Sequence, residues 1–287
     1  MQSKKEGKYM HFTKMQGLGN DYLYVFGEVP ENIEELSIKL SDRHFGPGAD
    51  GMIYICSSDV ADFKMRIFNA DGSEAKMCGN GIRCVGKYVF DYGYTDKKEL
   101  RIETLSGIKT LYLKTETRMN PGSSDIGNNT VEIVKEVTVD MGQAEVGESG
   151  DLIIQTGESF TYLPVSMGNP HAVIFTEDMA EVALEKVGPQ IEHHTFFPGG
   201  VNTEFVQVYS GTELRMRVWE RGSGITMACG TGTCASVMAA IERGYCEYNT
   251  PVTVHLDGGD LTIEIKEDKT VFMTGPAEFV YKGEIEA

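Results

Sequence analysis

The chain repeats itself once, and this repeat constrains the fold more than any other feature of its 287 residues. Met65-Arg-Ile-Phe-Asn69 matches Met216-Arg-Val-Trp-Glu220 at a separation of 151 residues. The same separation aligns Cys78-Gly-Asn-Gly81 with Cys229-Gly-Thr-Gly232. Two copies of several blocks in one order indicate the duplication of a domain, whereas a solenoid would need more repeats.

The duplication predicts a fold of the α+β class. We expect two pseudo-symmetric, strand-rich domains of the barrel or roll type, each wrapped around a central helix, with the active site in the cleft between them. The N-terminal domain would comprise residues 1–136 and be completed by a C-terminal strand at 277–287. The C-terminal domain would comprise residues 137–276.

Hydrophobic periodicity predicts the individual elements. Alternating or β-branched runs indicate strands at 22–27, 51–56, 62–68, 99–104, 107–114, 131–139, 171–176, 202–208, 213–219, 252–256, 260–266 and 270–274. Helical patterns occupy 32–42, 80–92, 178–193 and 230–243. Residues 257–260 are typical of a hairpin turn. Residues 1–9 are expected to form a loose extension, and the Gly-, Ser- and Asn-rich residues 119–129 a loop.

The charge of the chain excludes two classes of partner. Lys and Arg number 26 against 43 Asp and Glu, which gives a net charge of −17. Nucleic acids and anionic membranes both require a basic face, so we expect neither as a partner. No apolar run approaches the length of a bilayer span, and the first ten residues lack the apolar stretch of a signal peptide. These features favour a cytoplasmic protein.

The six cysteines are at positions 56, 78, 84, 229, 234 and 246. No two are spaced as Cys-x-x-Cys, so neither a structural disulfide nor a metal site is expected in a reducing compartment. Most of them are expected to be small buried apolar side chains. Cys78 and Cys229 differ, because each stands on a glycine-rich turn directly before a predicted helix.

This placement favours acid–base chemistry. The start of a helix presents N–H groups and the positive end of its dipole, which would lower the pKa of the thiol and bind a carboxylate. Two such thiols on opposite sides of one carbon could invert its configuration, one removing a proton and the other returning one. The alternatives are two structural helix entries with buried thiols, or a redox pair.

At this point the sequence resembles the diaminopimelate epimerase family of the pyridoxal-phosphate-independent amino-acid racemase superfamily. The resemblance rests on Asn69-Ala-Asp-Gly-Ser73 followed by Cys78-Gly-Asn-Gly-Ile-Arg83, and on Phe12 to Asp21 at the start. In the second half, Gly168-Asn-Pro-His171 and Glu220 to Gly232 carry it. The likeness runs from about residue 10 to about residue 280.

The resemblance implies a role for each matching residue. Cys78 and Cys229 would be the two catalytic bases, and His171 and Glu220 would lie beside the thiols and take their protons. The remaining residues would bind substrate: Asn20, Asn69, Gly79, Asn80, Asn169, Asn202, Glu220, Arg221, Gly230 and Thr231. Arg221 suits the distal carboxylate of the substrate, since a guanidinium can hold a carboxylate through two hydrogen bonds.

The implied reaction interconverts LL- and meso-2,6-diaminopimelate for lysine and peptidoglycan synthesis, without metal or organic cofactor, in a possible homodimer. The alternatives are a racemase for another amino acid, such as histidine, and a non-catalytic amino-acid-binding protein. Proline-racemase-like relatives tend to carry His at the position of Asn80 and lack Glu220-Arg221. This chain departs from common family residues at Gly51, Ile225 and Thr233.

Overall fold

The computed structural model describes residues 9–119 and 130–286. The predicted N-terminal extension and the predicted loop at 119–129 therefore lie outside the described residues, apart from Tyr9 and Met119. Tyr9 begins strand β1 and Met119 ends strand β7. The chain divides into two compact units: unit 1 is Met1–Val137 with Pro276–Ala287, and unit 2 is Thr138–Gly275.

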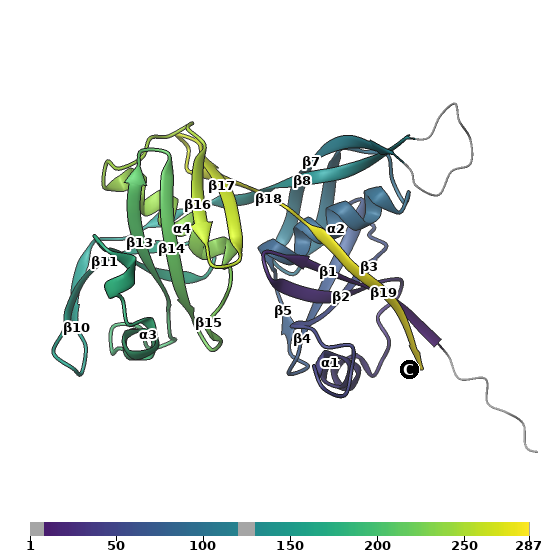
Figure 1. The fold of residues 1–287 in the computed structure, drawn as a ribbon, viewed down its shortest axis with the longest axis horizontal. Coiled ribbons are helices and arrows are strands. Elements are labelled where there is room, and N and C mark those ends of the chain that lie inside the picture. The colour runs from purple at the N-terminus through teal and green to yellow at the C-terminus, as the bar shows by residue number, and fades with distance from the viewer. Residues whose placement is uncertain (1–8, 120–129, 287) are drawn as a thin grey trace, which may run out of the picture. The chain divides into compact units, whose positions relative to one another are not determined.

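Unit 1 consists mainly of strands (Figure 1). In chain order it contains β1 (Tyr9–Gly17), β2 (Asn20–Phe26), α1 (Ile33–Ser41), β3 (Gly51–Cys56), β4 (Phe63–Asn69), β5 (Glu74–Ala75), α2 (Gly79–Asp91), β6 (Glu99–Thr104), β7 (Gly107–Met119), the first part of β8 (Thr130–Gln143) and β19 (Glu278–Glu286). The C-terminal strand β19 pairs antiparallel with β1, so the last residues of the chain complete the first unit.

Unit 2 repeats this order of elements. It contains the end of β8, β9 (Glu145–Val146), β10 (Gly150–Ile153), β11 (Ser159–Ser166), β12 (Pro170–Phe175), the 3₁₀ turn η1 (Met179–Glu181), α3 (Leu184–Glu192), β13 (Asn202–Ser210), β14 (Glu213–Glu220), β15 (Gly224–Ile225), α4 (Gly230–Glu242), β16 (Val252–Leu256), β17 (Gly259–Ile265) and β18 (Thr270–Gly275).

Strand pairing shows the duplication directly. β2 runs parallel to β3, and β12 runs parallel to β13. The antiparallel pair β3–β4 corresponds to β13–β14, and the parallel pair β4–β6 corresponds to β14–β16. In register, Leu23 lies opposite Met52 in unit 1, whereas Ala172 lies opposite Thr203 in unit 2. Ile53 of β3 and Glu204 of β13 therefore occupy equivalent positions.

One buried helix lies among the strands of each unit (Figure 1). α2 and α4 are both 13 residues long, and their side chains are buried over nearly the whole length. Each is followed, after one capping residue, by a glycine with positive φ, Gly93 at 73° and Gly244 at 75°. The amides that follow, Tyr94 and Tyr245, bond back to carbonyls of the last helical turn, as in a Schellman motif.

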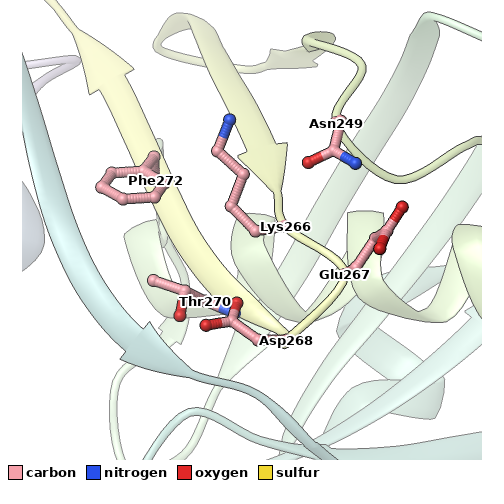
Figure 2. A pocket seen from close by; sticks show the side chains of 6 residues that line it. All are labelled: Asn249, Lys266, Glu267, Asp268, Thr270 and Phe272. Carbon is pink, nitrogen blue, oxygen red and sulfur yellow. The ribbon is translucent and has the colours of Figure 1, made fainter.

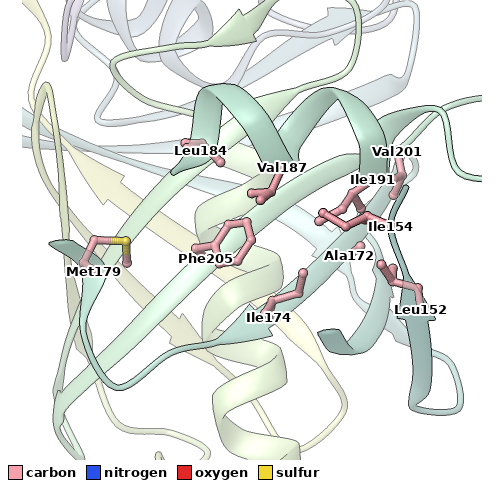
Figure 3. Close-up of a cluster of buried hydrophobic side chains, with 10 residues drawn as sticks. All are labelled: Leu152, Ile154, Ala172, Ile174, Met179, Leu184, Val187, Ile191, Val201 and Phe205. Carbon is pink, nitrogen blue, oxygen red and sulfur yellow. The ribbon is translucent and has the colours of Figure 1, made fainter. Parts of the chain in front are cut away.

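A second helix covers the other side of each sheet. In unit 1, Leu36 and Leu40 of α1 pack with Met52 and Phe68. In unit 2, Leu184, Val187 and Ile191 of α3 pack around Phe205 (Figure 3). Each unit thus has an apolar layer of its own between the sheet and its outer helix, which supports independent packing of the two units.

The predicted elements agree well with these bounds, and the α+β class with strand-rich, helix-centred units is confirmed. Every predicted strand is present. One helix was wrong, because residues 178–193 form η1 and α3, separated by extended backbone at Val182. β10 and β11 were not predicted, and β1 was expected only as a strand-like pattern that begins near Met10. No helix in residues 9–119 and 130–286 is long and apolar enough to cross a membrane.

Candidate active site

Cys78 caps the central helix of unit 1. Its backbone is extended, with φ −138° and ψ 115°, and its sulfur accepts a hydrogen bond from the Gly81 amide at 3.3 Å. The thiol donates to Oδ1 of Asn20 at 3.3 Å. The side chain is half-buried. A sulfur held at the first turn of a helix is well placed for proton transfer, because the nearby amides stabilise negative charge.

The Asn20 amide is oriented by Asp50, a residue that the sequence analysis did not assign to the site. Oδ2 of Asp50 accepts from Asn20 Nδ2 at 2.7 Å and from the Asp21 amide at 3.0 Å. Arg43 holds Asp50 and Asp21 together, with 2.8 Å and 2.7 Å ion pairs. Because Asp50 takes the amide nitrogen, the carbonyl oxygen of Asn20 is the group that faces Cys78.

The other predicted residues of unit 1 are Asn80, in the first turn of α2, and Asn69, at the end of β4. The Asn80 side chain is buried, and its Oδ1 accepts from Arg83 Nη1 at 3.1 Å. Arg83 is itself fully buried and also donates to the carbonyl of Pro276 at 3.1 Å, where the chain returns to unit 1. Asn69 ends β4 and donates to Ser73 Oγ at 3.1 Å. Arg83 therefore holds the first turn of α2 in place.

Cys229 caps the central helix of unit 2 in the same way. Its backbone has φ −115° and ψ 110°, and its sulfur accepts from the Gly232 amide at 3.4 Å. The Thr231 hydroxyl lies 3.7 Å from the sulfur. Unlike Cys78, this cysteine is buried, with 5% of its surface exposed. The two turns share one backbone conformation and differ in their surroundings.

Two carboxylates lie beside Cys229. Glu220 ends β14 and accepts from Thr226 Oγ1 at 2.5 Å. Burial raises the pKa of Glu220, although the Thr226 hydroxyl and the Cys229 thiol act in the opposite direction. The second carboxylate, Glu204, was not singled out in the sequence. It is fully buried on β13 and contacts the same helix turn.

One prediction about these thiols is wrong. We expected the helix start to lower the pKa of both cysteines. Burial, together with the negative charges of Glu220 and Glu204, instead raises the pKa of Cys229 well above its usual value. The Gly232 amide and the Thr231 hydroxyl lower this pKa, but their effect is smaller. Cys229 is therefore held as the protonated thiol.

His171 joins the second carboxylate to the predicted binding residues. It is buried on β12, with Nδ1 2.7 Å from Glu204 Oε1 and Nε2 3.2 Å from Asn169 Oδ1. Asn169 in turn donates to Thr231 Oγ1 at 3.3 Å. Hydrogen bonds thus connect four side chains below the turn that carries Cys229.

Asn202 and Arg221 lie at the end of this site. The side chains of both form hydrogen bonds with backbone groups. Asn202 donates to the Pro170 carbonyl at 3.0 Å and accepts from the Arg221 amide at 2.9 Å. The exposed Arg221 guanidinium contacts the Gly199 carbonyl at 3.2 Å. Buried Glu192 of α3 accepts from Trp219 and from the Gly222 amide, at 2.7 Å and 2.9 Å. Glu192 and Asn202 thus fix the backbone around Arg221.

All three departures from common family residues have a structural context. Gly51 has φ 158°, and a Cβ there would lie 2.2 Å from the Phe68 carbonyl, so this backbone accepts only glycine. Ile225 pairs with Trp219 at the edge strand β15 and is 36% exposed. Its neighbour Thr226, which bonds Glu220, carries the contact to the site. Thr233 is buried, and its hydroxyl donates to the Cys229 carbonyl at 2.7 Å.

A surface hollow of ≈ 540 Å³ lies elsewhere in unit 2, at the β17–β18 hairpin (Figure 2). Its lining includes Lys266, Glu267 and Asp268, and none of the predicted site residues. Asp268 caps the hairpin turn through the Thr270 amide at 3.0 Å, which is a structural role. In the described part of the chain, no three His, Cys, Asp or Glu side chains gather as a metal site.

Solved structures share this fold at low sequence identity. A hydroxyproline epimerase from Agrobacterium vitis superposes with a TM-score of 0.70 at 15% identity, covering 98% of this chain and 94% of that one. A phenazine biosynthesis protein of the PhzF family from Bacillus anthracis gives 0.71 at 15% identity, covering 97% and 99%. At this identity the likeness establishes the fold alone.

Sequence comparison establishes the family. The family described as diaminopimelate epimerase matches residues 12–146 and 163–280. Proteins named diaminopimelate epimerase from Parabacteroides distasonis and Acetivibrio thermocellus are 52% and 50% identical, over 96% of this chain and 98% and 99% of their own lengths. One from Methanococcus maripaludis is 50% identical over 96% of this chain and its whole length. The chain therefore belongs to the diaminopimelate epimerase family of isomerases.

Proposed function

We propose that this chain interconverts LL- and meso-2,6-diaminopimelate by a two-base mechanism without metal or organic cofactor. One observation carries the proposal most strongly. The central helix of each unit begins on a cysteine whose sulfur accepts the amide hydrogen bond of the third residue along. Two acid–base thiols on duplicated scaffolds suit a reaction that treats the two faces of one carbon alike.

The two units would act as two domains, near residues 1–136 with 277–287 and 137–276, that close on the substrate. Both sulfurs would then reach the same α-carbon from opposite faces. The Cys78 thiolate takes the α-proton and becomes a thiol. The Cys229 thiol gives its proton to the other face and becomes a thiolate. The configuration inverts, and the net change on the enzyme is one proton moved from Cys229 to Cys78.

The helix starts would stabilise the charge that develops on the substrate. In each helix the third amide is bonded to the cysteine sulfur and the fourth to the cysteine carbonyl. The first two amides, those of Gly79 and Asn80 and of Gly230 and Thr231, precede these bonds. They are suited to hold the α-carboxylate, whose negative charge grows as the carbon ionises.

The raised pKa of Cys229 sets the direction in which the resting enzyme works. For the isomer whose α-proton faces Cys78, Cys229 would act as the acid, and Cys78 would act as the base once its thiol has released the proton that it donates to Asn20. After turnover the proton must return before the same isomer reacts again. Glu220, whose charge acts on the pKa of Cys229, is suited to take part in that return.

The distal end of diaminopimelate is an unreacting amino acid that must still be recognised. Arg221 would bind its carboxylate and Glu220 its ammonium group. Asn20, Asn69, Asn169 and Asn202 would complete the binding set with amide hydrogen bonds. The distal contacts would exclude short amino acids such as alanine, since these cannot reach Arg221.

The setting of the enzyme follows from its chemistry and its surface. Its product would supply lysine and peptidoglycan synthesis, and its six cysteines, all present as thiols, suit the reducing cytoplasm.

Strand β19 leaves Phe279, Val280 and Tyr281 at 37%, 50% and 41% exposure. We propose that this apolar stretch, next to β1, is covered by a second copy in a homodimer, which light scattering of the full chain would test.

The experiment for the function is a panel of amino acids incubated with the enzyme in heavy water, with and without added pyridoxal phosphate. We expect deuterium at Cα of LL- and meso-diaminopimelate and at no other substrate, independent of the cofactor. Exchange of histidine in place of diaminopimelate would assign the chain to a different substrate. Binding of diaminopimelate without any exchange would reduce it to an amino-acid-binding protein.

A further inference from the structure

A buried carboxylate lies directly under the helix turn that carries Cys229. Glu204 of β13 has 0% of its surface exposed. A Cβ built on Gly232 of α4 would lie 2.5 Å from Glu204 Oε1 and 3.2 Å from the Cys229 sulfur. The glycine therefore lets this carboxylate reach the first turn of the helix.

Unit 1 shows that the fold itself does not need a carboxylate there. Ile53 occupies the equivalent position on β3, and a Cβ on Gly81 would lie 2.6 Å from its Cδ1. Tyr22 likewise stands where unit 2 has His171. An isoleucine supports the same helix turn on the same scaffold, so packing alone gives no reason for Glu204.

Glu204 is also costly to keep. Its Oε2 is buried and has no hydrogen-bond partner among the described residues. Burial of an incompletely bonded carboxylate is unfavourable, and such a group calls for an explanation beyond stability. The equivalent position under the Cys78 turn holds the apolar Ile53. The reason for a carboxylate at Glu204 must therefore lie in the surroundings of Cys229.

Hydrogen bonds lead from Glu204 to the sulfur. They run from Oε1 to His171 Nδ1 at 2.7 Å, from His171 Nε2 to Asn169 Oδ1 at 3.2 Å, and from Asn169 Nδ2 to Thr231 Oγ1 at 3.3 Å. Thr231 Oγ1 lies 3.7 Å from the Cys229 sulfur. Both ring nitrogens of His171 therefore face oxygens, one of Glu204 and one of Asn169.

We infer that Glu204 is a positioning residue for proton transfer at Cys229. It fixes the ring of His171 and, through Asn169 and Thr231, the groups that face the sulfur, and it places a negative charge that favours the thiol. The titratable side chains around Cys229 are His171 of β12, Glu204 of β13 and Glu220 of β14. This inference rests on the proposed two-base function and assigns unit 2 the acid of the resting enzyme.

The test uses the full chain with Glu204→Gln, which keeps the shape and removes the charge. We expect kcat for diaminopimelate to fall at least about tenfold with KM little changed, because positioning affects proton transfer more than binding. The pH profile of iodoacetamide alkylation at Cys229, followed by peptide mass spectrometry, should shift to lower pH. Glu204→Asp keeps the charge and should leave that profile close to wild type.

Two further variants separate the possible outcomes. Glu213→Gln removes an exposed carboxylate of the same unit and should change neither readout. Glu204→Ile installs the residue that unit 1 uses and should fold, with the same loss of kcat and the same shift as Gln. If Gln or Ile keeps the wild-type kcat and alkylation profile, Glu204 is structural and the inference is overturned. A wild type without exchange at Cα would instead refute the proposed function.

Discussion

The two units have the same topology but surround their cysteines with different chemistry. Cys78 is half-buried and donates to an asparagine amide, whereas Cys229 is buried between two carboxylates. The residues under the first helix turn are Tyr22 and Ile53 in unit 1, and His171 and Glu204 in unit 2. At the ends of the equivalent strands β4 and β14, Asn69-Ala70 corresponds to Glu220-Arg221.

We infer from this difference that the shared topology comes from the duplication, and that the different surroundings of the two cysteines arose by later divergence. Each unit keeps a cysteine, a helix start and an asparagine at the beginning of an equivalent strand, Asn20 in β2 and Asn169 just before β12. Unit 2 alone adds the charged residues that hold a proton near its thiol and that suit a distal carboxylate. On this account unit 2 carries the acid of the resting enzyme and the substrate specificity, and unit 1 supplies the second thiol.

The largest effect is expected from removing either thiol. Cys78→Ala and Cys229→Ala should each lower kcat for epimerisation by about 10³-fold or more, because each deletes one of two acid–base groups. Cys84→Ala and Cys234→Ala are the matched controls, since both are buried thiols within the helices that follow Cys78 and Cys229. Turnover within tenfold of wild type in either of the first two variants would refute the two-base assignment.

A smaller loss is expected from the predicted specificity residue. Arg221→Met should lower kcat/KM for diaminopimelate by roughly 10- to 100-fold, because a charged hydrogen bond contributes about 1.5–3 kcal/mol. Arg217→Met is the control, as Arg217 pairs with Asp257 at 3.3 Å. Steady-state kinetics with both isomers measure the effect. An unchanged kcat/KM in Arg221→Met would show that Arg221 does not bind the distal carboxylate, and unit 2 would then not determine the substrate specificity.

The asymmetry of the thiols can be tested through the other carboxylate. Glu220→Gln removes a negative charge that raises the pKa of Cys229, so the Cys229 thiolate should form at lower pH than in wild type. The pH dependence of alkylation at each cysteine reports this shift. The profile of Cys78 should not move. Equal shifts at both cysteines would mean that the effect is global and that the surroundings of Cys229 are not its cause.

The smallest expected effect is a difference in stability between alanine variants of two equivalent glycines, Gly81 and Gly232. In Gly81→Ala the new methyl meets the flexible end of Ile53, whereas in Gly232→Ala it meets Glu204 Oε1, which is held by His171. The second variant should lose about 1 kcal/mol more in free energy of unfolding, because its neighbour cannot move aside. Urea denaturation measures both variants. Equal losses would show that Glu204 is no more firmly held than Ile53.

Much of the scaffold was predictable from the sequence because duplication gave each pattern twice. The glycine after each central helix, the cysteine before it and the strands on either side all recur in one order. The single helix predicted at 178–193 was wrong. The apolar spacing of Met179, Val182 and Val187 resembles that of one helix, although the backbone is extended at Val182. β10 was missed because it is only four residues long, and β11 because Pro164 interrupts its strand pattern.

The site was predictable only where a motif marked it. Glu204 was hidden within Asn202 to Phe205, where strand alternation says which face a residue occupies but not that a carboxylate is buried there. One signal existed, because aligning the repeat in the register of the strands sets Glu204 against Ile53. The pKa of Cys229 was not predictable, since burial and two carboxylates from neighbouring strands outweigh the helix start.

The most direct test of the central claim is hydrogen transfer in heavy water. Wild-type enzyme is given one protiated isomer of diaminopimelate, and the reaction is stopped early. Two opposed thiols predict that the product carries deuterium at Cα while the unreacted substrate keeps its protium, because the acid thiol exchanges with solvent before it reacts. Product that retains the protium of its substrate would show that one group removes and returns the same proton, which contradicts two bases.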